Sequence, residues 1–180
     1  MKGIVFTEFI EMVEEKFSQE TADRLLDECD LPSGGAYTAV GTYDHQEIVR
    51  MVIKLSEISG QPAPTLVNTF GRHLFGRFVV LYPAFFTEVD SAMDFLARIE
   101  EIIHAEVRKL YPDAELPRFD IARPDERTLV MTYHSDRHLG DLAEGLIEAC
   151  IIHYGRPLGI VREDLALPGQ PVRFTISSPA

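Results

Sequence analysis

The sequence lacks the features that mark several large classes of protein. It has only two cysteines, Cys29 and Cys150, which are too few for a disulfide framework and too far apart for a zinc motif. We expect both to be buried thiols in a reducing compartment. No stretch approaches the roughly 20 apolar residues that a membrane-spanning helix requires. Motifs of a hydrolase nucleophile, a zinc protease or a phosphate-binding loop are also missing.

Basic residues are scarce as well. The chain has 17 Lys and Arg residues against 29 Asp and Glu residues, and its formal net charge is −12. This charge argues against nucleic acid or an anionic membrane as the main partner. The apolar stretch at the N-terminus is short and is broken by four glutamates within residues 8–15. It does not resemble a signal peptide, so we expect a cytoplasmic protein.

What the chain does contain is enough apolar material, 46% of 180 residues, for one domain with a sizeable core. Helical spacing and capping residues predict helices over residues 5–17, 18–30, 45–60, 61–83, 91–110 and 140–154. Runs with a period of two predict strands over residues 117–122, 127–133, 156–163 and 171–177. The order after the first helices is β-β-α-β-β, so we predict an α+β fold with a four-stranded antiparallel sheet. Within this single domain, residues 1–60 form a helical lobe and residues 61–180 form the lobe with the sheet.

Three polar residues close the second predicted strand, in the segment "YHSDR". If the strand continues through this segment, Tyr133, Ser135 and Arg137 project to the same face. Two hydroxyls and a guanidinium offer several hydrogen-bond donors, which suits a carboxylate or a phosphate. The alternative is an ordinary strand end whose polar residues face water.

A single histidine, His104, lies on the predicted helix over residues 91–110. It is about a quarter-turn from the centre of the apolar stripe formed by Leu96, Ile99, Ile103 and Val107. A flat ligand could approach it over the small side chain of Ala97. The alternative is a half-exposed surface histidine.

Taken together, these features resemble the bacterial H-NOX family. These heme nitric oxide/oxygen binding domains are related to the heme domain of soluble guanylate cyclase. The resemblance rests on the start "MKG", the lone His104, Pro117 thirteen residues later, and "YHSDR" as Tyr-x-Ser-x-Arg. It extends over nearly the whole chain, including "GRHLFGRF" and the β-β-α-β-β segment.

The resemblance implies that heme b is held between the two lobes. In this interpretation His104 is the proximal ligand of the iron. Tyr133, Ser135 and Arg137 hold the two heme propionates. These propionates are the carboxylates that suit the three polar side chains. Pro117 presses on the porphyrin and distorts it from planarity.

The resemblance also implies which gas the heme binds. Family members that bind oxygen stably have a distal tyrosine where this chain has Leu142. In those members a tryptophan and an asparagine support the tyrosine, and this chain has Phe9 in place of the tryptophan and Leu74 in place of the asparagine. The expected distal pocket is therefore apolar, and it is completed by Val5, Phe78 and Leu146. Such a pocket favours nitric oxide and carbon monoxide over stable oxygen, because bound oxygen carries partial negative charge and gains from a buried donor. His73 or Tyr82 could supply that donor by turning inward.

We therefore predict a heme-based nitric oxide sensor and not an enzyme. The chain ends shortly after the last predicted strand, so we expect a separate effector, which the resemblance suggests is a histidine kinase or a cyclic-di-GMP synthase or phosphodiesterase. One alternative is an oxygen-binding or redox heme protein. Another is a cofactor-free interaction module in which Arg137 captures a carboxylate of a protein partner.

Overall fold

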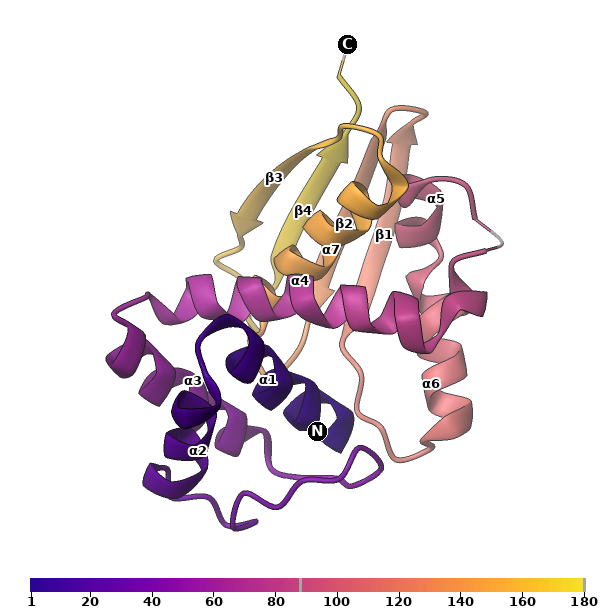
Figure 1. Cartoon of the computed structure of the whole chain (residues 1–180). Helices are drawn as coiled ribbons and strands as arrows, with labels where there is room; N and C mark the ends of the chain where they lie inside the picture. Colours follow the sequence, from indigo (N-terminus) through magenta and orange to yellow (C-terminus); the bar gives the residue numbers. More distant parts are fainter. Residues whose placement is uncertain (88, 180) are drawn as a thin grey trace.

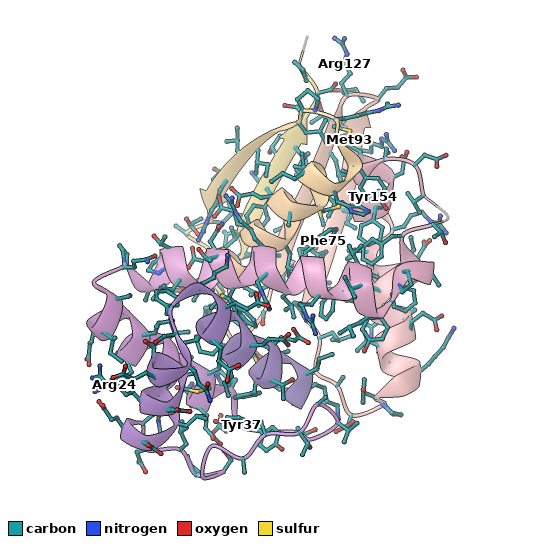
Figure 2. The ribbon with its side chains drawn as sticks, viewed as in Figure 1. Arg24, Tyr37, Phe75, Met93, Arg127 and Tyr154 are labelled. Atoms are coloured by element: carbon teal, nitrogen blue, oxygen red, sulfur yellow. The ribbon has the colours of Figure 1, made fainter. Side chains whose placement is uncertain are left out.

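The computed structural model describes residues 1–87 and 89–179, and it places two lobes on either side of the long helix α4 (Ala63–Leu81). Figure 1 shows the N-terminal helices below α4 and the sheet with helix α7 above it. Tyr37 lies in the helical lobe, whereas Phe75, Met93 and Tyr154 lie on the sheet side of α4 (Figure 2). Among the described residues, no helix combines the length and the apolar character that crossing a membrane requires.

The helical lobe consists of α1 (Gly3–Lys16), α2 (Gln19–Glu28) and α3 (His45–Ser59). Polar side chains cap the N-termini of α2 and α3. The Ser18 hydroxyl accepts a hydrogen bond from the Thr21 N–H, and the Asp44 carboxylate accepts one from the Gln46 N–H. Gly60 ends α3 in the left-handed conformation, which glycine adopts without steric cost.

The sheet lobe confirms the predicted α+β fold. Its strands are β1 (Arg118–Asp125), β2 (Thr128–His134), β3 (Gly159–Asp164) and β4 (Val172–Ser177), paired antiparallel in the order β1-β2-β4-β3. Helix α7 (Gly140–Tyr154) lies between β2 and β3 in the chain and packs on one face of the sheet. That face is lined by alternate, fully or nearly fully buried residues of the two central strands, Leu129, Met131, Tyr133, Val172, Phe174 and Ile176.

The buried residues form two apolar clusters, one in each lobe, and α4 contributes to both. Leu66, Phe70 and Leu74 belong to the cluster of the helical lobe, whereas Phe75 belongs to the cluster around the sheet. The two clusters therefore meet within α4. The division at residue 60 that we predict from the sequence remains a prediction.

The helix predicted over residues 91–110 differs in the structure. It begins at the Ser91 cap, but α5 (Ala92–Ala97) is followed by a π-helical stretch, Glu100–His104, and then by α6 (Ala105–Leu110). In the π-helical stretch the Ala105 N–H bonds to the Glu100 carbonyl, five residues back. The wider turn rotates the following side chains relative to a continuous α-helix. As a result His104 is buried, although the α-helical pattern places it a quarter-turn from the apolar stripe.

Helices α4 and α7 cross in backbone contact where a glycine of each helix meets the other. A Cβ atom on Gly145 would lie 2.1 Å from the Asn68 carbonyl oxygen, and one on Gly71 would lie 2.4 Å from the Leu142 carbonyl oxygen. Neither neighbour is a flexible side-chain end. Only glycine therefore permits this approach of the two helices.

We expect Gly145→Ala to lower the free energy of unfolding by about 1–3 kcal/mol, since the methyl group must push α4 and α7 apart. The matched control is Gly76→Ala, because a Cβ atom there meets no heavy atom within 4 Å. The control should be neutral or slightly stabilising, as expected when alanine replaces glycine within a helix. Urea denaturation of the two variants measures the difference, and equal midpoints would contradict the packing argument.

Candidate functional site

A cavity of about 410 Å³ lies between the two lobes. This volume is within the range of roughly 300–1,000 Å³ that is typical of ligand and cofactor cavities. Residues of α1, α4, α5, the π-helical stretch, α6, β2, α7 and the loop over residues 111–117 line it. Most of the lining is apolar, and its larger side chains include Phe75, Phe78, Leu96, Ile103, Leu146 and Ile147.

The polar residues of "YHSDR" lie together on one edge of this cavity, although not on one strand face. β2 ends at His134, so Ser135 and Arg137 lie in the turn that follows, and the strand alternation we expected does not reach them. The turn is held by the Arg137 N–H, which donates to the Ser135 hydroxyl at 3.2 Å. Tyr133, Ser135 and Arg137 all line the cavity.

The guanidinium of Arg137 is set up to bind a carboxylate. Its side chain is only 14% exposed, and its Nη2 donates to the Glu115 carboxylate at 2.5 Å. Its Nη1 donates to the Glu115 carbonyl oxygen at 2.7 Å. The Glu115 side chain is 84% exposed, so this carboxylate reaches Arg137 from the solvent side. One nitrogen of the guanidinium thus binds a backbone carbonyl and the other a carboxylate, and a guanidinium at this edge also suits other carboxylates.

Tyr133 contributes a protonated hydroxyl to the same edge. The residue is only 5% exposed, and burial raises the pKa of the Tyr133 phenol above its ordinary value. The hydroxyl therefore keeps its proton and can donate to an anion. Together with Ser135 and Arg137 it supplies the donor set that a pair of carboxylates requires.

His104 lines the same cavity, and the structure excludes the half-exposed alternative. The residue is 8% exposed, and burial lowers the pKa of the imidazole, so the ring is neutral at physiological pH. Its Nδ1 lies 3.1 Å from Glu100 Oε1 but is not aligned for a hydrogen bond. Its Nε2 makes no hydrogen bond to any residue that the structure describes. A neutral imidazole with a free nitrogen is the usual form of a histidine metal ligand.

Pro117 lies where the chain leaves the loop over residues 111–117 and enters β1, and it lines the cavity. Two residues later, the Phe119 ring lies 6.0 Å from the His104 ring, centroid to centroid. The structure thus brings Pro117 and His104 to the same cavity, as the resemblance implies.

The predicted distal residues divide into two groups. Val5, Phe78, Leu142 and Leu146 line the cavity, whereas Phe9 and Leu74 do not. Phe9 and Leu74 pack instead into the apolar cluster of the helical lobe. There the Phe9 ring meets the Phe70 ring edge-on at 5.3 Å, because both residues lie on the faces that α1 and α4 turn toward each other. Phe9 and Leu74 therefore support the cavity wall from behind.

The two candidate donors, His73 and Tyr82, also differ. His73 is buried between α1 and α4, where its ring nitrogens lie 3.6 Å from the carboxylates of Glu8 and Glu15. It is not among the lining residues. Tyr82 does line the cavity, and its ring stacks on Phe85 at 5.7 Å.

Further residues to which the sequence analysis gave no role at this site also line the cavity. Cys150 is fully buried and lines the cavity, while Cys29 is only partly buried, so the expectation of two buried thiols holds for Cys150 alone. Glu115 and Lys2 lie at the cavity edge. Glu115 precedes Pro117 by two residues in an irregular loop, where no periodicity marks it. Lys2 is part of the "MKG" start, and this motif was the one feature of the sequence that could have pointed to Lys2.

The residues at this site fit a flat apolar group that carries both a metal and carboxylates. The cavity is apolar, a buried imidazole lines it, and a guanidinium at its edge already holds a carboxylate. Heme combines these properties.

Comparison with known proteins agrees with this class of cofactor site. A family model described as Haem-NO-binding matches residues 2–162, and the chain belongs to this family of heme-binding domains. The unliganded Fe(II) H-NOX protein from K. algicida is 35% identical, covers 100% of this chain and 97% of its own, and superposes with a TM-score of 0.93. The H-NOX from Shewanella woodyi, solved with IWP-051 in the Fe(II)CO state, is 39% identical over 99% of this chain and 95% of its own, with a TM-score of 0.85.

A third structure shows the same fold at lower similarity. The H-NOX protein from S. oneidensis in the Fe(II)NO state is 23% identical over 100% of both chains, with a TM-score of 0.91. No curated protein is similar to the chain by sequence.

Proposed function

We propose that this protein is a heme-based sensor of nitric oxide that acts in the cytoplasm and is not an enzyme. It binds nitric oxide and carbon monoxide, binds oxygen weakly or not at all, and signals to a separate effector protein. The observation that carries this proposal is the apolar part of the cavity lining to which α1, α4 and α7 contribute Val5, Phe78, Leu142 and Leu146.

His104 would hold ferrous heme b, which would supply an iron able to bind nitric oxide. Oxygen as a ligand accumulates negative charge and is retained best by a hydrogen-bond donor in a dry pocket. Nitric oxide accumulates little charge and needs no donor. The four apolar side chains therefore favour nitric oxide over oxygen.

The cavity lining supports the remaining roles. His104 would supply the neutral nitrogen that binds the iron. Tyr133, Ser135 and Arg137 would donate to the two propionates, which would otherwise be desolvated at the rim of an apolar cavity at considerable cost. Pro117, which also lines the cavity, would press on the porphyrin and distort it from planarity.

A contact between the lobes supports a route for the signal. The Lys2 ammonium donates to the Thr42 hydroxyl at 2.8 Å and lies 2.9 Å from an Asp113 carboxylate oxygen. Thr42 belongs to the helical lobe, and Asp113 lies in the loop that joins the His104 helix to Pro117. Release of His104 would shift α6 and this loop, and the Lys2 contact would carry the shift to the helical lobe. We propose that a histidine kinase or a cyclic-di-GMP synthase or phosphodiesterase reads this change.

The experiment that tests the proposal is a set of absorption spectra. The protein is loaded with heme, reduced, and mixed with nitric oxide without air, and a second reduced sample is exposed to air. We expect a nitric oxide complex in the first sample and no stable oxygen complex in the second. A protein that takes up no heme would support the interaction module instead.

A stable oxygen complex in air would favour the second candidate function, an oxygen-binding or redox heme protein. The observation in favour of this alternative is that Tyr82 lines the cavity. In that case Tyr82→Phe should abolish the oxygen complex.

A further inference from the structure

Glu100 is the acidic residue closest to the His104 ring. It opens the π-helical stretch that His104 closes, so the two side chains lie on the same side of the widened turn. Glu100 Oε1 lies 3.1 Å from His104 Nδ1. This nitrogen is buried and has no hydrogen-bond partner among the described residues. A buried polar atom of this kind normally has a partner, and the carboxylate is the group in reach.

The Glu100 carboxylate is itself held in place from two other elements. Its Oε1 accepts a hydrogen bond from the Phe119 N–H of β1 at 3.0 Å. Its Oε2 accepts one from Arg108 Nη2 of α6 at 3.2 Å. Both partners are hydrogen-bond donors, and the Arg108 cation favours the carboxylate form of the group that they hold beside the imidazole.

We propose that Glu100 is a positioning residue that orients the His104 imidazole and makes its cavity-facing nitrogen a stronger ligand of the heme iron. The inference rests on the proposed heme function and adds to it a residue that sets how readily nitric oxide releases His104. An anion beside one ring nitrogen holds the proton there and increases electron density on the other nitrogen. A stronger bond between His104 and the iron resists the release that carries the signal.

The main variant is Glu100→Gln, which keeps the size of the side chain and an oxygen for the Phe119 N–H but removes the charge. In the heme-loaded ferrous protein we expect a lower Fe–His stretching frequency by resonance Raman and a higher reduction potential. With nitric oxide, the ratio of released to iron-bound His104 should rise about tenfold, at the lower end of the effect of replacing residues that contact a metal ligand.

Glu101→Gln is the matched control. The Glu101 side chain is 75% exposed and its nearest cation is Arg98, at 3.6 Å. This variant removes the same charge one residue away and should leave the Raman band, the potential and the nitric oxide spectrum unchanged.

Arg108→Gln distinguishes an electronic role from a merely structural one. Without the Arg108 cation, the Glu100 carboxylate is less neutralised and should strengthen the His104 ligand further. The Raman band should then rise and the potential should fall, opposite in sign to Glu100→Gln. Shifts of the same sign in both variants would mean that Glu100 only supports the local fold, and would overturn the inference.

Failure of this inference differs from failure of the proposed function. If Glu100→Gln matches the wild type in all three measurements, Glu100 does not act on His104, although the protein remains a heme sensor. If the wild-type protein takes up no heme, or its ferrous form shows no Fe–His band, the proposed role of His104 fails and the inference falls with it.

Discussion

Replacing His104 with glycine should abolish stable heme binding, and imidazole in the buffer should restore it. The variant removes the buried imidazole that lines the cavity, while the apolar walls and the polar edge stay in place. Glycine leaves a space of the right size for a free imidazole, which can occupy the position of the lost ring. The measurement is the heme absorption band after gel filtration, with and without imidazole.

The control for this prediction is His138→Gly. His138 is exposed, lies next to Arg137, and has a positive φ of 50°, a conformation that glycine adopts more readily. We expect full heme retention in this variant. Circular dichroism of His104→Gly checks that the helix survives, because glycine within a helix costs about 1 kcal/mol. Heme retention by a folded His104→Gly protein without imidazole would remove His104 from the site.

The parts of the fold that follow local rules could be predicted from the sequence. Ser18 and Asp44 cap their helices because short polar side chains satisfy free N–H groups wherever a helix begins. The strands follow from alternation, since Leu129, Met131 and Tyr133 can all face the core only in an extended chain. These signals involve neighbours in the chain and do not depend on the rest of the molecule.

The sequence predictions that the structure corrects concern features that local sequence rules do not determine. A π-helical turn inserts one residue into a helix without changing its composition, so the pattern around His104 reads as a continuous α-helix. Ser135 and Arg137 reach the cavity through a turn and not through strand alternation. Phe9 and Leu74 are apolar on either face of their helices, and only the packing of α1 on α4 shows that they lie behind the cavity wall.

The candidate site contains residues that the sequence marks and residues that only the tertiary structure brings into place. His104, Pro117 and the polar residues of "YHSDR" are marked by their types and spacing, so the resemblance could identify them. Glu100 and Glu115 are ordinary surface-type glutamates in the sequence, and their contacts with His104 and Arg137 depend on the tertiary structure. The sequence thus predicts which groups could hold the cofactor, and the structure adds the residues that orient them.

The second large effect expected is a gain of oxygen binding when Leu142 is replaced with tyrosine. Leu142 lines the cavity from α7, and a tyrosine there would add a hydrogen-bond donor to an apolar part of the lining. A hydrogen bond to a charged group contributes about 1.5–3 kcal/mol, which corresponds to roughly a 10- to 100-fold rise in oxygen affinity. Oxygen titration of the ferrous protein measures this rise, and nitric oxide affinity should change little.

Leu142→Phe separates the hydroxyl from the ring that carries it. Phenylalanine fills the cavity almost as tyrosine does but cannot donate a hydrogen bond. If polarity decides the choice of gas, only Leu142→Tyr gains oxygen affinity, and Leu142→Phe stays like the wild type. If cavity volume decides it, the two variants change together. Equal oxygen affinities in the two variants would show that the apolar character of this wall is not what discriminates nitric oxide from oxygen.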